Sequence, residues 1–78
     1  DLKKLVSKVL ECDASIVVIA HNHPDGNPFP SGADADVTGS ISVMLRKINI
    51  SLYDHIIIGD NKHFSMREHP LYSNLFDG

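Results

Sequence analysis

The sequence has a single cysteine, Cys12, and no run of apolar residues longer than a β-strand. One thiol cannot form a disulfide within the chain, which favours a reducing compartment, and we expect the cytoplasm. A membrane-spanning helix needs about 18 or more consecutive apolar residues. The longest apolar runs are residues 16–20 and 56–58, so we expect no membrane span.

Positive charge is also scarce, with 7 Lys and Arg against 10 Asp and Glu and a formal net charge of −3. The only local excess, at Lys3, Lys4 and Lys8, is explained by the solvated face of a helix. Nucleic-acid-binding domains usually present a basic patch, so nucleic acid is not the expected partner. The chain opens at Asp1 without a methionine or a visible signal peptide, and we interpret residues 1–78 as a single, N-terminally truncated domain.

The pattern of apolar residues predicts an α/β fold. Helical spacing indicates a helix over residues 2–11, and the β-branched run at residues 15–20 is typical of a strand buried on both faces. Three prolines and an Asp-Gly pair make residues 21–30 a loop. A second strand is predicted over residues 52–58, and a short third strand over 63–66 turns back on it.

A second helix is predicted between the loop and the 52–58 strand. Its apolar positions recur every three or four residues, at Val37, Ile41, Met44, Leu45 and Ile48. A strand, a helix and a strand in this order predict a parallel βαβ unit. Since so few strands make a small sheet, we expect further strands to precede this chain in the complete protein.

His21 and His23 follow the first predicted strand and suggest a metal site. Residues two apart in an extended chain point to the same side, with Cα atoms about 6.5–7 Å apart, so two imidazoles can meet at one ion. Asp34, in the first turn of the second helix, is the candidate third ligand. Two histidines and one aspartate leave a fourth tetrahedral position open, which is typical of catalytic zinc.

Each of these residues also has a simpler explanation. Ser31 and Asp34 have the spacing of a helix capping box, with Ser31 as the N-cap. The Ser31 hydroxyl can cap the helix and still face the site, so the two interpretations are compatible. The histidines, taken without Asp34, can be ordinary surface groups beside a loop.

The complete spacing resembles the signature of the JAMM (JAB/MPN-type) zinc metalloproteases: His-x-His, seven residues, Ser, two residues, Asp. The flanking sequences H-N-H-P-x-G-x-P-x-P-S and L-x-D-H-I-I-I-G-D resemble the bacterial RadC branch. The resemblance implies a cytidine-deaminase-like α/β/α sandwich with a mixed sheet. It also implies zinc held by His21, His23 and Asp34, with Ser31 as a catalytic residue that hydrogen-bonds the bound water or the developing oxyanion.

The chain departs from the family's pattern in its general base, which in the family is a glutamate well upstream of the histidine pair. Here only Glu11 precedes the pair, and Glu68 lies beyond the second strand, so neither is expected to be the base. Loss of a general base costs about 10²–10⁴ in rate. We therefore expect this chain to bind zinc and to hydrolyse substrate poorly. In the loop, Phe29 either packs on its neighbours or contacts substrate.

His55, in the second predicted strand, either hydrogen-bonds a metal ligand or is a satisfied strand histidine. The function implied by the resemblance is hydrolysis of a peptide or isopeptide amide in a protein or peptide substrate. The alternative is a non-catalytic, metal-stabilised interaction module. The RadC name is historically associated with DNA repair, which the charge does not support. A nucleobase deaminase needs H-x-E and P-C-x-x-C motifs. This sequence has H-N-H and a single cysteine, so that function is excluded.

Overall fold

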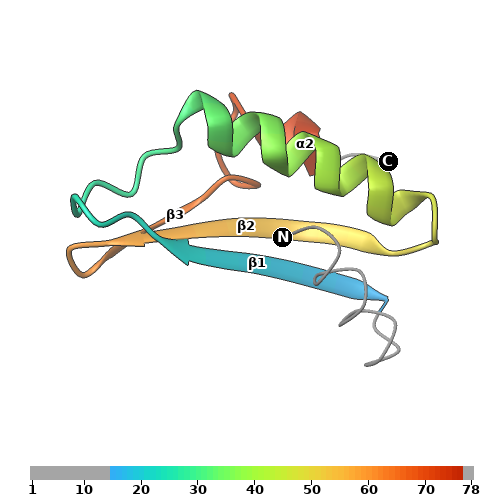
Figure 1. Cartoon of the computed structure of the whole chain (residues 1–78), viewed down its shortest axis with the longest axis horizontal. Coiled ribbons are helices and arrows are strands. Elements are labelled where there is room, and N and C mark those ends of the chain that lie inside the picture. The colour runs from blue at the N-terminus through green and yellow to red at the C-terminus, as the bar shows by residue number, and fades with distance from the viewer. Residues whose placement is uncertain (1–14, 77–78) are drawn as a thin grey trace.

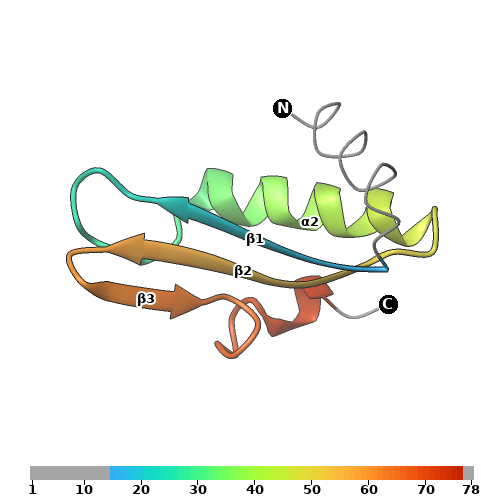
Figure 2. The same ribbon diagram turned by 90° about the horizontal axis from the view of Figure 1, so that it is seen from below.

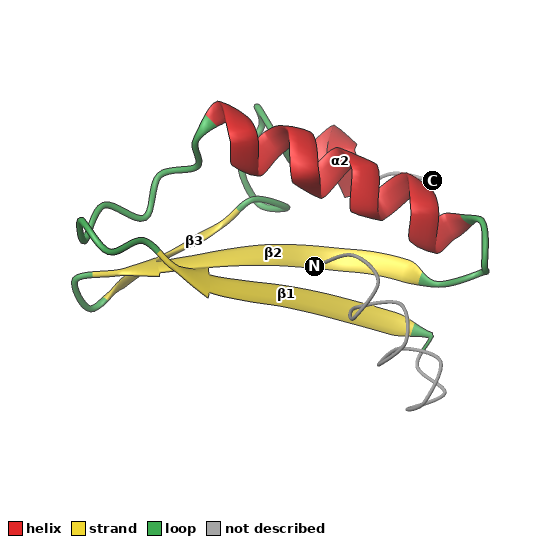
Figure 3. Ribbon diagram, viewed as in Figure 1, coloured by secondary structure: helices red, strands yellow, loops and turns green. Residues whose placement is uncertain are grey.

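The computed structural model describes residues 15–76. In chain order the elements are β1 (Ile16–Asn22), α2 (Gly32–Arg46), β2 (Ser51–Gly59), β3 (Lys62–Ser65) and a 3₁₀ helix, η1 (Ser73–Phe76). Figure 1 shows α2 lying along one side of the strands, and Figure 3 colours the same view by secondary structure. The helix predicted over residues 2–11 lies outside the described residues.

The strands form one mixed sheet in the order β1-β2-β3. β1 pairs with β2 in parallel and α2 connects them, which confirms the predicted βαβ unit. β2 pairs with β3 in antiparallel fashion, as the third predicted strand required. Asp60 and Asn61 join these two strands with positive φ angles of 47° and 60°. Two such residues are typical of the tight hairpin turn that matches the twist of the strands.

Helix α2 begins where the sequence predicts a cap. The Ser31 side chain accepts a hydrogen bond from the backbone N–H of Asp34, and the Asp34 side chain accepts one from the backbone of Ser31. The two bonds satisfy N–H groups that have no partner within the helix. Further along, Ile41 and Leu45 are buried against the sheet, with Ile57 beneath them in the same core.

The prediction that the first strand is buried on both faces is wrong. Along β1 the residues alternate between exposed and half-buried, and Ile16 and Val18 are 63% and 54% exposed. Val17 and Ile19, on the other face, pack against the core. The physical reason is visible in Figures 1 and 2: within residues 15–76, α2 is the long helix of the fold and covers one face of the sheet only. A continuous apolar run did not reveal which face would be covered.

The C-terminal part of the described chain packs onto the core. η1 lies beside α2, and its last residue, Phe76, belongs to the buried core. No helix in residues 15–76 is long and apolar enough to cross a membrane.

Candidate metal centre

The candidate site lies where β1 ends and α2 begins. β1 continues two residues beyond its predicted end at Ala20, so His21 lies within the strand rather than after it. His23 follows directly, and its backbone N–H donates to the carbonyl oxygen of Ile58 at 2.9 Å. Because the chain stays extended, both imidazoles lie on the side of the sheet that carries α2. The capped first turn of α2 brings Asp34 to the same point.

The three side chains converge within a short distance. One ligand atom from each of His21, His23 and Asp34 lies within 4.8 Å of the other two. His23 Nε2 is 2.9 Å from Asp34 Oδ2, and His21 Nε2 is 3.5 Å from Asp34 Oδ1. Two imidazole nitrogens and a carboxylate oxygen form a donor set that suits zinc. All three side chains are half-buried, so they remain partly accessible to solvent.

The loop between β1 and α2 is held by its own hydrogen bonds. Gly26 has a φ of 83°, and its N–H donates to the carbonyl oxygen of His23 at 3.0 Å, which closes a tight turn. The side chain of Asp25 accepts from the N–H of Asn27, and the side chain of Asn27 accepts from the N–H of Phe29. These local turns fix the position of the Asn27 carbonyl oxygen.

The Asn27 carbonyl oxygen in turn orients His23. It lies 2.8 Å from His23 Nδ1, and a carbonyl can only accept, so Nδ1 carries a proton. Nε2 then faces Asp34. The bond to Asn27 raises the pKa of His23; burial opposes this shift, and Asp34 adds to it. A proton and a metal ion therefore compete for Nε2.

Asp34 belongs both to the N-terminal cap of α2 and to the candidate metal centre. Burial raises the pKa of Asp34, but the hydrogen bonds from Ser31 and His23 lower it by a larger amount. The net pKa therefore lies below the ordinary value, and the carboxylate is ionised at neutral pH. Oδ2 accepts from the Ser31 backbone N–H at 2.8 Å and lies 2.9 Å from His23 Nε2. The cap and the contact with the histidines thus coexist. Ser31 is at the helix N-terminus, and its hydroxyl oxygen accepts from the Asp34 N–H at 3.1 Å.

His55 is buried beneath His21. Its Nε2 lies 2.7 Å from His21 Nδ1, and its Nδ1 lies 2.6 Å from the hydroxyl oxygen of Thr38. Burial lowers the pKa of His55, and the nearby His21 lowers it further, so the neutral ring is favoured. Both ring nitrogens have partners, and one partner is a candidate ligand. Thr38 was missed by the sequence analysis, although it lies one helical turn after Asp34 and therefore on the same face of α2.

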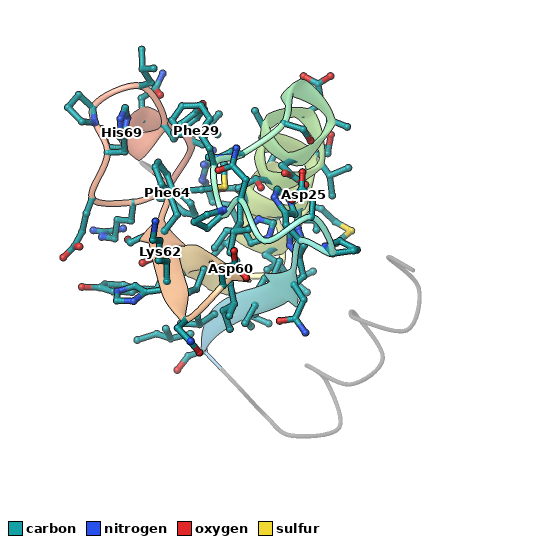
Figure 4. The ribbon with its side chains drawn as sticks, turned by 90° about the vertical axis from the view of Figure 1, so that its left-hand side faces the viewer. Asp25, Phe29, Asp60, Lys62, Phe64 and His69 are labelled. Carbon is teal, nitrogen blue, oxygen red and sulfur yellow. The ribbon has the colours of Figure 1, made fainter. Side chains whose placement is uncertain are left out.

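Phe29 packs against a group of aromatic rings beside the site. Its ring centroid is 5.3 Å from that of Phe64, and 6.1 Å from those of both His69 and Tyr72. Figure 4, which faces this end of the molecule, shows Phe29, Phe64 and His69 gathered on one side of it. Phe29 remains 48% exposed. The cluster anchors the loop to β3, and of the two roles expected for Phe29, packing is the one that the structure contains.

Within the described residues, the other acidic side chains of the loop and of the segment after β3 lie outside this cluster. Asp25 is exposed on the loop and binds the backbone of Asn27, and it is not part of the group of three. Glu68 is exposed after β3, where its N–H donates to the Ser65 hydroxyl oxygen. Glu11 lies outside the described residues. Asp34 is therefore the one carboxylate of the candidate centre within residues 15–76.

Fold and site together define a small α/β domain with a candidate metal centre at the junction of a strand and a helix. The chain belongs to the RadC-like JAB domain family, whose model matches residues 1–71. It is 42% identical over 69 residues to a UPF0758 protein of Alkaliphilus oremlandii, covering 88% of this chain and 30% of the relative. It is 43% identical over 65 residues to a UPF0758 protein of Carboxydothermus hydrogenoformans, covering 83% of this chain and 29% of the relative. The chain thus spans under a third of these relatives.

Proposed function

We propose that this domain is the metal-binding part of a zinc-dependent hydrolase that cleaves a peptide or isopeptide amide in a peptide or protein substrate. His21, His23 and Asp34 would hold the zinc. The observation that carries the proposal is the convergence of their three ligand atoms within 4.8 Å at one corner of the fold. Membership of the RadC-like JAB family supports it.

The donor set suits catalysis because three protein ligands leave coordination positions for water and substrate. A zinc ion held there would supply Lewis acidity, polarising the substrate carbonyl and lowering the pKa of water. Asp34 contributes the one negative charge of the donor set. His23 is oriented by its bond to the Asn27 carbonyl, which directs Nε2 toward Asp34.

Ser31 is proposed to act on the substrate rather than on the metal. It is the N-cap of α2, where the helix dipole places partial positive charge and favours an anion. A hydroxyl in this position can donate a hydrogen bond to a carbonyl oxygen as negative charge develops on it. The Asp34 N–H binds the hydroxyl oxygen, which leaves the hydroxyl proton available for such a bond.

The general base is proposed to come from the part of the complete protein that this chain does not span. The chain covers only 30% of a relative's length, and Glu68 lies outside the candidate centre. Without that base we expect hydrolysis to be about 10²–10⁴ slower. Zinc binding does not need it, so the domain is proposed to bind zinc and to be a poor catalyst by itself.

One observation favours the second candidate, a metal-stabilised interaction module. Ile16, Val18, Tyr53 and Ile58 are exposed, which leaves apolar side chains on the strands uncovered by α2. In the interaction module this face would bind a partner, whereas in the proposed hydrolase, a complete α/β/α sandwich, a second layer of the same protein would cover it. The single cysteine agrees with the cytoplasm as its location. Neither role calls on nucleic acid.

The first experiment is to measure zinc per chain by elemental analysis after metal-free purification and zinc titration. We expect one tightly held zinc in the wild type. Asp34→Asn retains an oxygen that can accept the hydrogen bond from the Ser31 N–H but removes the negative charge. This variant should therefore lose zinc, while circular dichroism should show that α2 remains folded. Asp36→Ala, an exposed aspartate in the same part of α2, is the matched control and should retain it.

Wild type without zinc, or zinc that persists in Asp34→Asn, would remove the basis of the hydrolase. Zinc binding accompanied by no cleavage in the full-length protein, over a panel of peptide and isopeptide substrates and with a chelator as the blank, would favour the interaction module. Chelator-sensitive cleavage would support the hydrolase.

A further inference from the structure

A chain of hydrogen bonds runs from helix α2 through the core to His21. Thr38 is fully buried and His55 is 4% exposed. We infer that Thr38 and His55 are positioning residues that fix His21 in the tautomer whose Nε2 lone pair faces the candidate metal centre. The inference rests on the proposed function for its significance, but for neutral histidine rings the proton positions follow from the contacts without a metal.

The order of the protons starts at Thr38. Its hydroxyl oxygen lies 2.6 Å from the carbonyl oxygen of Asp34 and 2.6 Å from His55 Nδ1. A hydroxyl has one proton to donate, and a carbonyl oxygen can only accept. The Thr38 proton is therefore directed to Asp34. Within residues 15–76 this hydroxyl has one further contact, with Met66 Sδ at 3.7 Å, which is longer and is also to an acceptor.

The next bond must run in the opposite sense. Since the Thr38 proton is directed to Asp34, His55 Nδ1 has to donate to the Thr38 oxygen. A neutral imidazole carries one N–H, so His55 Nε2 has a lone pair. That nitrogen lies 2.7 Å from His21 Nδ1 and can only accept there.

The sequence of donors ends at the site. His21 Nδ1 must donate to His55, which leaves the lone pair of a neutral His21 on Nε2. The distances agree: His21 Nε2 is 3.5 Å from Asp34 Oδ1, whereas His23 Nε2 is 2.9 Å from Asp34 Oδ2. The shorter contact is a hydrogen bond and the longer one is not, as expected for an unprotonated Nε2 on His21.

Thr38 lies on α2 and His55 on β2, and the packing of this helix against this strand brings the two side chains together. Every buried side-chain polar atom within residues 15–76 has a hydrogen-bond partner, so the relay is fully satisfied by the protein itself. A metal-bound histidine usually donates its second N–H to a carboxylate, a carbonyl or water. Here the acceptor is a second, neutral imidazole, whose own tautomer is set by a threonine.

The direct test is two-bond ¹H–¹⁵N NMR of the histidine rings in metal-free protein at a pH of about 8, above the ordinary histidine pKa of about 6.5. The inference predicts protonated Nδ1 and unprotonated Nε2 for both His21 and His55. A protonated Nε2 on either ring would overturn it. This readout needs neither zinc nor activity, and the wild type alone is sufficient.

Variants at Thr38 test whether the relay matters for the metal. Thr38→Val keeps the shape but removes the oxygen that accepts from His55. We expect His21 to shift toward the Nε2–H tautomer and the zinc Kd to rise about 10–100-fold, as for other partners of metal-bound histidines. Thr38→Ser should restore both properties. Ser42→Ala, which removes another buried hydroxyl from α2, is the matched control and should change neither.

A folded Thr38→Val protein with wild-type ring shifts and wild-type zinc affinity would contradict the relay. Failure of the proposed function has a different signature: the wild type would show the predicted tautomers and yet bind no zinc. Conversely, tight zinc binding with the opposite tautomer would leave the hydrolase proposal intact and remove the relay.

Discussion

A β-carbon on Gly59 would lie 2.5 Å from the carbonyl oxygen of Gly26, because the loop after β1 rests directly on the end of β2. This separation is well below contact distance, and the obstructing atom is backbone, so it cannot move aside like a side chain. Glycine at position 59 thus lets the loop approach the strand. The same loop carries the Asn27 carbonyl that orients His23.

Gly59→Ala should displace the loop and lower both stability and metal affinity. Forcing extra atoms into a packed region typically costs about 1–3 kcal/mol. We expect a loss of that size in the free energy of unfolding, measured by urea denaturation, together with weaker zinc binding. The matched control is Gly32→Ala, where an added β-carbon meets nothing within 4 Å. Because the backbone at this position tolerates alanine, Gly32→Ala should raise the free energy of unfolding by about 0.4–1 kcal/mol.

Equal stabilities for the two alanine variants would mean that the loop is not held against β2 in solution. Weaker zinc binding in Gly32→Ala would show that the helix start, rather than the loop, controls the site.

Zinc affinity should rise with pH. The pKa of His23 is raised above its ordinary value by the Asn27 carbonyl and by Asp34, so near neutral pH a proton competes with the metal for Nε2. Below this raised pKa, zinc has to displace the proton on Nε2, so the apparent zinc affinity falls about tenfold for each pH unit that the pH is lowered. Above this pKa, His23 no longer makes the zinc affinity depend on pH. Competition titration with a zinc indicator across the range measures the slope. A flat profile would exclude His23 as a ligand.

The buried His55 should make the metal-free protein less stable at acidic pH. Burial lowers the pKa of His55, so below the unfolded value of 6.5 the unfolded chain binds a proton that the folded chain does not. The contribution to stability is present in full above pH 6.5 and is lost as the pH falls through the lowered folded value. His23, with its raised pKa, contributes in the opposite sense: its stabilisation is present below 6.5 and is lost as the pH rises.

Comparing the wild type with His55→Gln separates the contribution of His55 to the pH dependence of stability from that of His23. Glutamine can still accept from His21 and donate to Thr38, but it does not titrate. The unfolding free energy of the wild type should therefore fall, relative to this variant, as the pH drops below 6.5. A constant difference between the two proteins would show that His55 is not kept neutral by burial.

The sequence predicted those parts of the site that depend on local geometry. His21 and His23 share a side because a strand alternates with period two, and Asp34 is placed by a cap that four consecutive residues define. The parallel βαβ unit followed from the alternation of patterns. These features need no knowledge of how distant segments pack, which is why they could be anticipated.

Features that depend on packing between elements were not predictable in the same way. Thr38 meets His55 only because of how α2 sits on β2, and no spacing in the sequence encodes that contact. The covered face of β1 is likewise chosen by the position of α2. The packing of Phe29 on Phe64 joins the loop to β3, whose alignment is fixed by the hairpin turn.

Substitutions at Ser31 should separate helix capping from catalysis. Ser31→Ala removes the cap and should cost about 1 kcal/mol of unfolding free energy, whereas asparagine is as good a cap as serine, so Ser31→Asn should cost little. Neither change removes a proposed ligand, so zinc stoichiometry should stay the same in both. In the full-length protein both should lower kcat about 10²–10³-fold, the cost of losing one oxyanion donor. If Ser31→Asn cleaved substrate at the wild-type rate, the hydroxyl would be a cap alone, and the donor to the developing negative charge would have to be sought elsewhere in the complete protein.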